Sequence, residues 1–137
     1  MKVRRAIATF ALGLTVSVMP LAAHHSILAT FDISKEITIR GVVTKVAWIN
    51  PHARFWVDAR NDDGIVSNWE LELPPPNALK RNRGVGADFI KPNDQVTVVL
   101  WQAKDGARLG NTLDLVFSDG RVLKFGRNIT NDWVMVQ

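Results

Sequence analysis

The sequence predicts an all-β domain with one short helix, folded as a small OB-like Greek-key barrel. Apolar and polar residues alternate with a period of two through several short segments, turn residues separate these segments, and a single helical stretch follows the third of them. Three strands, a short helix and then further strands are typical of an OB-fold. A small β-sandwich is the alternative that the same pattern allows.

The first 23 residues follow the pattern of a secretory signal peptide. Lys2, Arg4 and Arg5 form a basic start, an apolar run follows, and the small residues Ala22 and Ala23 end it. The apolar run is shorter than the roughly 20 residues that a membrane span needs. We therefore expect Sec-type export to a bacterial periplasm or to the exterior, with no stable membrane span after cleavage. An uncleaved N-terminal anchor is the alternative.

Removal of the signal peptide changes the charge balance of the chain. Three of the 17 Lys and Arg residues lie in the signal, which leaves 14 against 13 Asp and Glu residues. A nearly neutral domain lacks the basic surface typical of nucleic-acid binding, so we expect no nucleic-acid partner. The sequence has no cysteine, which excludes disulfides and thiolate ligands. The remainder of the 137 residues is enough for one domain.

A lead-in segment over residues 24–36 is expected to precede the barrel domain of residues 37–137. The first strand begins at Ile37. Its apolar residues change parity midway, from Ile37, Ile39 and Val43 to Val46 and Trp48. Such a change predicts a β-bulge, which we place near Thr44 and Lys45, with Gly41 easing a bend. Long, bent first strands of this kind are typical of small curled barrels.

Two further strands are predicted before the helix. The turn Asn50-Pro51-His52 ends the first strand, because proline cannot continue a central strand. The segment Asn61-Asp62-Asp63-Gly64 is a strong hairpin signal between the second and third strands. The residues expected to face inward are Phe55, Val57 and Ala59, followed by Trp69, Leu71 and Leu73.

The helix and the later strands complete the predicted order. Pro74-Pro75-Pro76 ends the third strand, Asn77 is the expected N-cap of a helix to about Arg83, and Gly84 is its expected stop. Lys91-Pro92-Asn93-Asp94 predicts the turn before the fourth strand. The apolar positions of the remaining strands are Val96, Val98 and Leu100, then Leu113, Leu115 and Phe117, then Val122 to Phe125, and finally Trp133 to Val136.

Two tryptophans fall on the outward parity of their strands. Trp56 and Trp101 alternate with inward residues, and outward aromatic rings on an OB-type sheet stack on sugars or bases. They are the candidate ligand-binding residues, with a saccharide or peptide favoured over nucleic acid. The alternative is that the lead-in segment or the C-terminal apolar stretch covers both rings as a second apolar layer.

Three histidines form the candidate metal site. His24 and His25 directly follow the signal peptide, and His52 lies in the first turn. Cleavage after Ala23 makes His24 the N-terminal residue, whose amine and imidazole resemble a copper-binding histidine brace. Cleavage after Ala22 makes His25 the third residue of the mature chain, as in N-terminal motifs that bind Cu(II) or Ni(II) in a square plane. Nitrogen-rich tetragonal sites favour Cu(II) or Ni(II). We expect Cu(II) above all; a solvated tail and a turn histidine are the alternative.

The evidence for catalysis is weak. Glu70 and Glu72 share one strand face, but carboxylates on an exposed strand are most often solvated. Ser26 lies next to His25 in sequence, which establishes no catalytic geometry. We therefore favour a binding protein, which takes a transition-metal ion or, in the alternative without metal, a small ligand or an envelope protein.

Several short motifs occur in a familiar order along the chain. They are Ala23-His24-His25-Ser26, Phe31-Asp32, Gly41-Val42-Val43, Asn50-Pro51-His52, Trp69-Glu70-Leu71-Glu72, Asn77-Ala78-Leu79 and Lys91-Pro92-Asn93-Asp94. With these motifs the chain resembles small exported bacterial proteins of the domain-of-unknown-function family numbered 6152. The resemblance implies export and a single small β-domain, and it implies no activity. One departure is Asn93, where the family pattern leads us to expect glycine.

Overall fold

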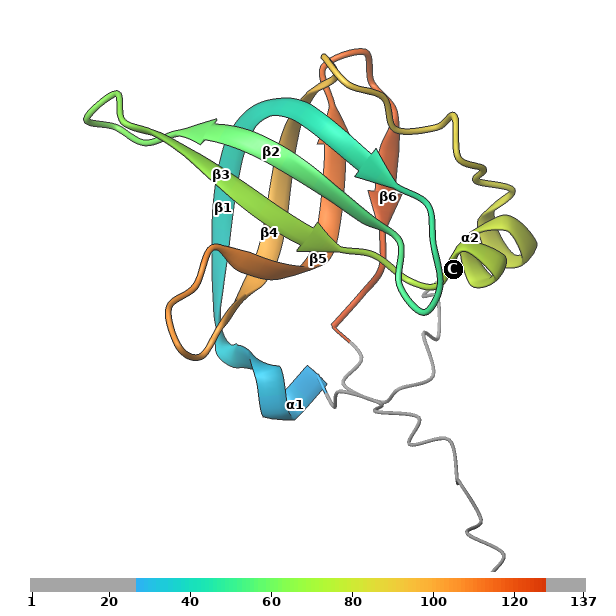
Figure 1. Ribbon diagram of the computed structural model, residues 1–137, viewed down its shortest axis with the longest axis horizontal. Helices are drawn as coiled ribbons and strands as arrows, with labels where there is room; N and C mark the ends of the chain where they lie inside the picture. Colours follow the sequence, from blue (N-terminus) through green and yellow to red (C-terminus); the bar gives the residue numbers. More distant parts are fainter. Residues whose placement is uncertain (1–26, 128–137) are drawn as a thin grey trace, which may run out of the picture.

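The computed structural model describes residues 27–127 of the chain (Figure 1). Six strands and two short helices follow one another in the order α1 (Ile27–Thr30), β1 (Phe31–Ala47), β2 (Arg54–Arg60), β3 (Val66–Glu72), α2 (Pro76–Arg83), β4 (Gln95–Ala103), β5 (Leu109–Phe117) and β6 (Val122–Lys124). The predicted all-β class is confirmed. The helix after the third strand is α2, and the four-residue α1 was not predicted.

All six strands belong to one sheet, in the order β3-β2-β1-β4-β5-β6. The neighbours in this order are antiparallel, and a parallel pairing between β3 and β5 joins five of the strands into a ring. The helix α2 connects β3 to β4 and lies at one side of the ring (Figure 1). This is the strand order of an OB-like barrel, so that prediction is confirmed, and the alternative of a two-sheet sandwich is wrong.

The strand β1 is long because it has two partners. It pairs with β4 between Phe31 and Val42 and with β2 from Gly41 onward. The register with β2 shifts between Val43 and Lys45, so the predicted bulge is confirmed and Thr44 is the extra residue.

Gly41 lies at the point where β1 changes partner, and it passes very close to β2. A Cβ atom at this position would lie 2.1 Å from the backbone oxygen of Asp58. Contacts this short are forbidden, so only glycine fits the bend.

The interior of the ring is filled by the residues that the alternation predicts to face inward. Phe55, Val57, Leu71, Val98 and Leu115 are each completely buried. Trp69, which is also predicted to face inward, is half-buried and packs against this core. The period-two pattern therefore identifies the barrel core correctly.

A second apolar cluster lies outside the ring. It consists of Ile27 and Phe31 from the start of the described chain and of Trp101 and Leu113 from β4 and β5. Between β4 and β5 the register shifts after Val99, which leaves Leu113 as the extra residue and turns it outward. α1 therefore covers the outer face of these two strands.

The start of β1 differs from the sequence prediction. The strand begins at Phe31 and not at Ile37, so part of the predicted lead-in segment is strand. Phe31 pairs with Ala103 and Glu36 pairs with Trp101, which leaves four residues of β1 opposite one residue of β4. These extra residues are mostly polar and exposed, so they show no alternation that a sequence pattern would detect.

The ends of α2 are set by proline and glycine. The helix begins at Pro76 with Pro75 as its N-cap and no side-chain cap, so the prediction of Asn77 as N-cap is wrong. Proline suits the first helical position because its fixed φ is already helical and its missing N–H has no partner there. Gly84 ends the helix in the left-handed conformation with a φ of 64°, as predicted.

Arg127 fastens the end of the described chain to the outer face of the sheet. Its Nε and Nη2 donate to the two carboxylate oxygens of Glu36 at 2.8 and 3.0 Å, and its Nη2 also donates to Asp114 Oδ2 at 3.0 Å. The hydrogen bond from Arg127 lowers the pKa of Glu36 below its ordinary value of 4.5. This three-residue clamp joins β1, β5 and the segment after β6.

The substitution Gly41→Ala is expected to destabilise the fold by about 3 kcal/mol or more, because its Cβ overlaps a backbone atom that cannot move away without breaking the β1–β2 ladder. The free energy of unfolding in urea measures this loss. Thr38→Ala, on an exposed position of the same strand, is the control and should cost no more than about 1 kcal/mol. Equal stability of the two variants would contradict the steric argument.

The Arg127 clamp is expected to weaken in acid. Because the pKa of folded Glu36 is lowered, its contribution is fully present above the ordinary pKa of 4.5 and is lost as the pH falls through the folded-state value. The difference in unfolding free energy between the wild type and Arg127→Gln should therefore shrink as the pH is lowered past 4.5. Arg81→Gln, at another exposed arginine, is the control, and a difference independent of pH would count against the clamp.

Candidate functional site

Of the three candidate metal ligands, the structure describes one. His24 and His25 lie outside residues 27–127, so their predicted role stays a prediction. His52 lies in the loop between β1 and β2, directly after the cis peptide bond that joins Asn50 to Pro51. The predicted turn at this position is confirmed.

His52 is half-buried and contacts the end of β3. Its Nδ1 lies 3.3 Å from the backbone oxygen of Leu73. A carbonyl oxygen only accepts hydrogen bonds, so Nδ1 is the donor in this contact. A backbone carbonyl that fixes the ring in this way is a common arrangement behind metal-binding histidines.

The strand β5 pairs with the end of β3, which His52 contacts, and it also packs against α1. Leu73 follows Glu72, which pairs with Asn111 of β5, and Leu113 of the same strand packs against Ile27 of α1. In Figure 1 α1 lies below the strands, whereas the β1–β2 loop lies at the right, near α2.

Within residues 27–127, no group of three or more His, Cys, Asp or Glu side chains is close enough together to hold a metal ion. His52 is the one candidate ligand among these described residues, and the other two candidates lie outside them. No helix in the described range is long and apolar enough to cross a membrane.

Trp56 lies among charged and polar side chains on the outer face of β2 and β3. The ammonium group of Lys45 lies 4.5 Å from the centre of its ring. Arg54 donates to Glu70 at 2.9 Å and to Glu72 at 3.2 Å on the neighbouring strand. The ring is half-buried, so part of its surface reaches solvent. Glu70 and Glu72 are paired with arginine here and form no acid–base pair of their own.

Trp101 faces outward as its parity predicts, but its ring is covered. It is 3 % exposed because Ile27 and Phe31 pack against it, as the alternative of a second apolar layer predicts. Its role in ligand binding stays a prediction, and in this conformation a ligand does not reach the ring.

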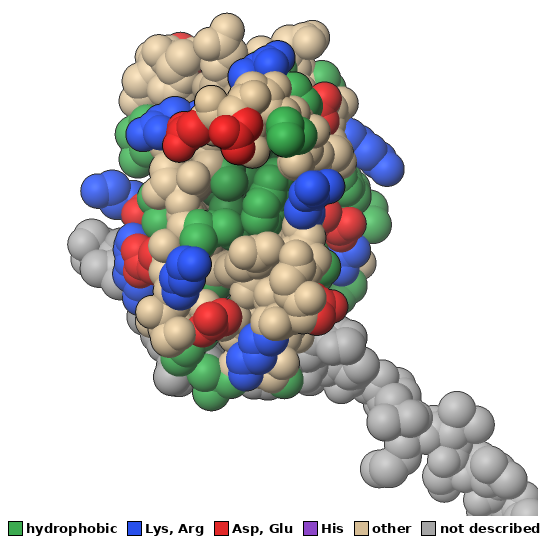
Figure 2. Space-filling model, turned by 90° about the vertical axis from the view of Figure 1, so that its left-hand side faces the viewer, with side chains coloured by type: hydrophobic (Ala, Val, Ile, Leu, Met, Phe, Trp, Pro, Cys, Tyr) green, Lys and Arg blue, Asp and Glu red, His purple; other side chains and the backbone are tan. Residues whose placement is uncertain are grey.

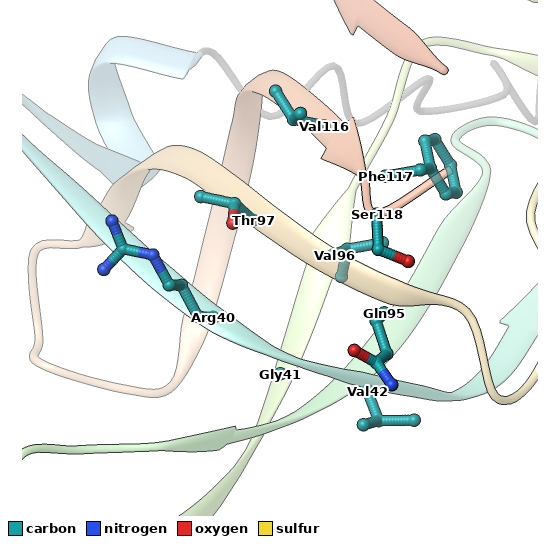
Figure 3. Close-up of a pocket in the computed structure, with 9 residues that line it drawn as sticks. All are labelled: Arg40, Gly41, Val42, Gln95, Val96, Thr97, Val116, Phe117 and Ser118. Carbon is teal, nitrogen blue, oxygen red and sulfur yellow. The ribbon is translucent and has the colours of Figure 1, made fainter. Parts of the chain in front are cut away.

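The structure also contains a surface groove that the sequence does not predict. A groove of about 460 Å³ runs over the outer face of β1, β4 and β5, and Figure 3 shows its lining. Arg40 and Thr97 lie side by side on paired strands, and Val116 is the partner of Thr97 on β5. A second groove of about 590 Å³ shares Gly41 and Val42 with the first. The sequence signal is weak: valines at Val42 and Val116 occupy outward positions where a polar residue is the usual choice.

Figure 2 shows hydrophobic side chains gathered in a shallow hollow, with Lys, Arg, Asp and Glu side chains around it. This side of the molecule carries the tip of the β2–β3 hairpin (Figure 1). No His side chain is visible on this face.

The comparisons with known proteins identify a family. The chain has no significant match among curated proteins or among solved structures. Residues 13–112, more than half of the chain, match a family of unknown function, DUF6152, and they span all three histidines and both candidate tryptophans. The chain therefore belongs to the DUF6152 family.

Proposed function

We propose that this protein is an exported metal-binding protein that holds Cu(II) with the histidines at the start of its mature chain and with His52. Copper(II) favours several nitrogen ligands in a tetragonal arrangement, and a free amine beside two imidazoles supplies them. The proposal assigns binding and no catalysis.

The observation that carries the proposal is the contact between His52 and Leu73. The carbonyl of Leu73 accepts from Nδ1 and so fixes the orientation of the ring, as outer partners do for metal-binding histidines. The half-buried position also limits the ring's rotation, which reduces the entropy lost on binding.

The position of α1 makes the site geometrically reasonable. His24 and His25 precede the buried residue Ile27 by three and two positions. An extended chain covers about 3.3–3.6 Å per residue. The backbone atoms of His24 and His25 therefore stay within about 10 Å of the backbone of Ile27, and the side chains add to this reach. Ile27 packs on Leu113, and the strand that contains Leu113 is the parallel partner of the β3 end near His52.

The purified mature protein is expected to bind one Cu(II) with electron paramagnetic resonance couplings dominated by nitrogen. His24→Ala should abolish this species, and His52→Ala should weaken binding by at least the roughly 10–100-fold that is typical for loss of a metal's outer partners. Binding should also weaken on acidification, because protons compete with the metal for imidazole. Asn77→Ala, at an exposed helix position, is the control.

Two outcomes would argue against this site. Unchanged affinity in His24→Ala would remove the N-terminal ligands from the proposal. Unchanged affinity in His52→Ala would reduce the site to a terminal motif that does not involve the barrel. The intact mass of the mature protein, with and without copper, gives the cleavage point and the stoichiometry.

A second candidate function is binding of a saccharide at Trp56. The observation that favours it is a partly exposed indole beside hydrogen-bonding groups that sugars use, which include the paired Arg54 and Glu70 and the Asn68 amide that donates to Asp58 at 2.7 Å. An aromatic face and fixed polar groups are the usual components of such sites.

Titration with a panel of oligosaccharides is expected to shift tryptophan fluorescence in the wild type and not in Trp56→Ala. Trp69→Phe, which changes a ring that packs against the core, is the control and should keep the response. The absence of any response across the panel would leave Trp56 as a structural residue whose ring packs against Lys45.

A further inference from the structure

The two surface grooves meet and form one surface. Gly41 and Val42 line both of them. From this meeting point one groove extends over β4 and β5 to Val116, and the other extends over β2 and β3 to Val66. We call the combined surface the valine groove. Its lining residues come from all five strands of the ring.

Exposed apolar side chains are concentrated at the valine groove. Five of the eight large apolar side chains that are exposed in the described range lie in it or directly beside it. They are Val42, Val66 and Val116 in the groove, Val122 as the cross-strand partner of Val116, and Ile65 as the sequence neighbour of Val66. Exposed apolar side chains that gather in one place mark an interaction surface.

Two arginines of the valine groove form no ion pair with another described residue. Arg40 and Arg60 flank the pair Gly41–Ala59, at which the β1–β2 ladder begins, and both occupy outward positions of the period-two alternation. The six ion pairs of the described range involve neither of them. Arg60 donates to the backbone oxygen of Gly64, which leaves its charge without a carboxylate.

The groove therefore presents excess positive charge beside apolar surface. The single carboxylate among its lining residues is that of Asp58, which accepts from the Asn68 amide at 2.7 Å. An occupant that combines acidic groups with an apolar side chain complements this surface in both charge and hydrophobicity.

The tip of the β2–β3 hairpin has this complementary chemistry. Asp62 and Asp63 are exposed and form no ion pair with another described residue, and Ile65, which follows two positions later, is 60 % exposed. Hydrogen bonds between Asn61 and Ile65 hold the tip in line with the hairpin, which projects from the ring (Figure 1). The tip is thus directed away from the groove of its own chain and is available to another molecule.

We propose that the valine groove docks the hairpin tip of a second copy of this chain, so that the protein forms a two-fold symmetric dimer. Arg60 and Val66, the last pair of the hairpin before its tip, also line the groove, so tip and groove are adjacent. Adjacent complementary patches suit an isologous interface, in which each tip meets the groove of the other copy and both contacts form together. This surface shares no residue with the proposed metal site, so the two proposals stand or fall separately.

The oligomeric state of the purified protein tests the proposal. Sedimentation velocity at about 100 μM is expected to show a dimer, because specific interfaces have dissociation constants in the micromolar range or below. Charge reversal of the tip, by Asp62→Lys with Asp63→Lys, should weaken self-association at least about tenfold, because like charges then face each other. Charge reversal of the groove, by Arg40→Glu with Arg60→Glu, should have an effect of the same size.

An equimolar mixture of the two reversed variants should form a heterodimer. The basic tip of one variant then meets the acidic groove of the other, and the unchanged tip of the second meets the unchanged groove of the first. Such recovery also shows that both variants are folded. Arg81→Glu on α2 and Asp105→Lys in the turn between β4 and β5 are matched controls at exposed positions outside both patches, and they should leave the dimer unchanged.

Three outcomes would refute the proposal. They are a wild type that stays monomeric at this concentration, a dimer that both charge reversals leave unchanged, and a mixture of the reversed variants that stays monomeric. Binding of a synthetic acidic peptide with apolar residues to a monomeric wild type would assign the valine groove to a different protein partner and would likewise exclude the second copy as its occupant.

Discussion

The close approach of Gly41 to the backbone of Asp58 is the constraint on which the rest of the fold depends. It lets β1 bend so sharply that one strand serves two neighbours, β4 with its first part and β2 with its last part. Without that bend the two antiparallel halves of the sheet would diverge. β3 would then not meet β5, and the ring would stay open. His52 keeps its place beside the end of β3 through the pairing of β2 with β3, which continues past both strands in the hydrogen bond from Leu73 to Ala53.

The outer face of β1, β4 and β5 is organised in successive rows of paired residues. The row that contains Trp101 and Asn111 lies beneath α1. The next row contains Asp114, which Arg127 covers through its ion pair. The row after that, with Arg40, Thr97 and Val116, forms part of the groove shown in Figure 3. Among the described residues, this continuous sheet face is thus covered at one end by α1 and Arg127 and accessible at the other.

The sequence predicts most of the barrel because period-two alternation and turn residues act locally. Residues such as Phe55 and Leu115 are recognisable from their immediate neighbours, as is the bulge at Thr44. The beginning of β1 and the helix α1 are different. Their structure comes from the packing of Ile27 and Phe31 on Trp101, a contact between residues about seventy positions apart that no local pattern encodes. For the same reason the exposure of Trp101 was not predicted by its parity. The contact of His52 with Leu73 joins two loops and is equally invisible in the sequence.

The pairing of β3 with β5, which closes the ring, is the shortest strand pairing within the ring. β3 and β5 share three residue pairs, in parallel orientation, and about forty residues of chain separate them. Parallel pairs of this kind form late, because the entropy of a long loop must be overcome before any contact compensates for it. The pairing of β1 with β4 is similarly distant in sequence. The chain should therefore fold slowly for its size, through a stage in which the β2–β3 hairpin exists while the edge of β5 is unpaired. In that stage the unpaired edge of β5 is exposed to pairing with other unfolded chains, so the time before closure is when a chaperone would have most effect.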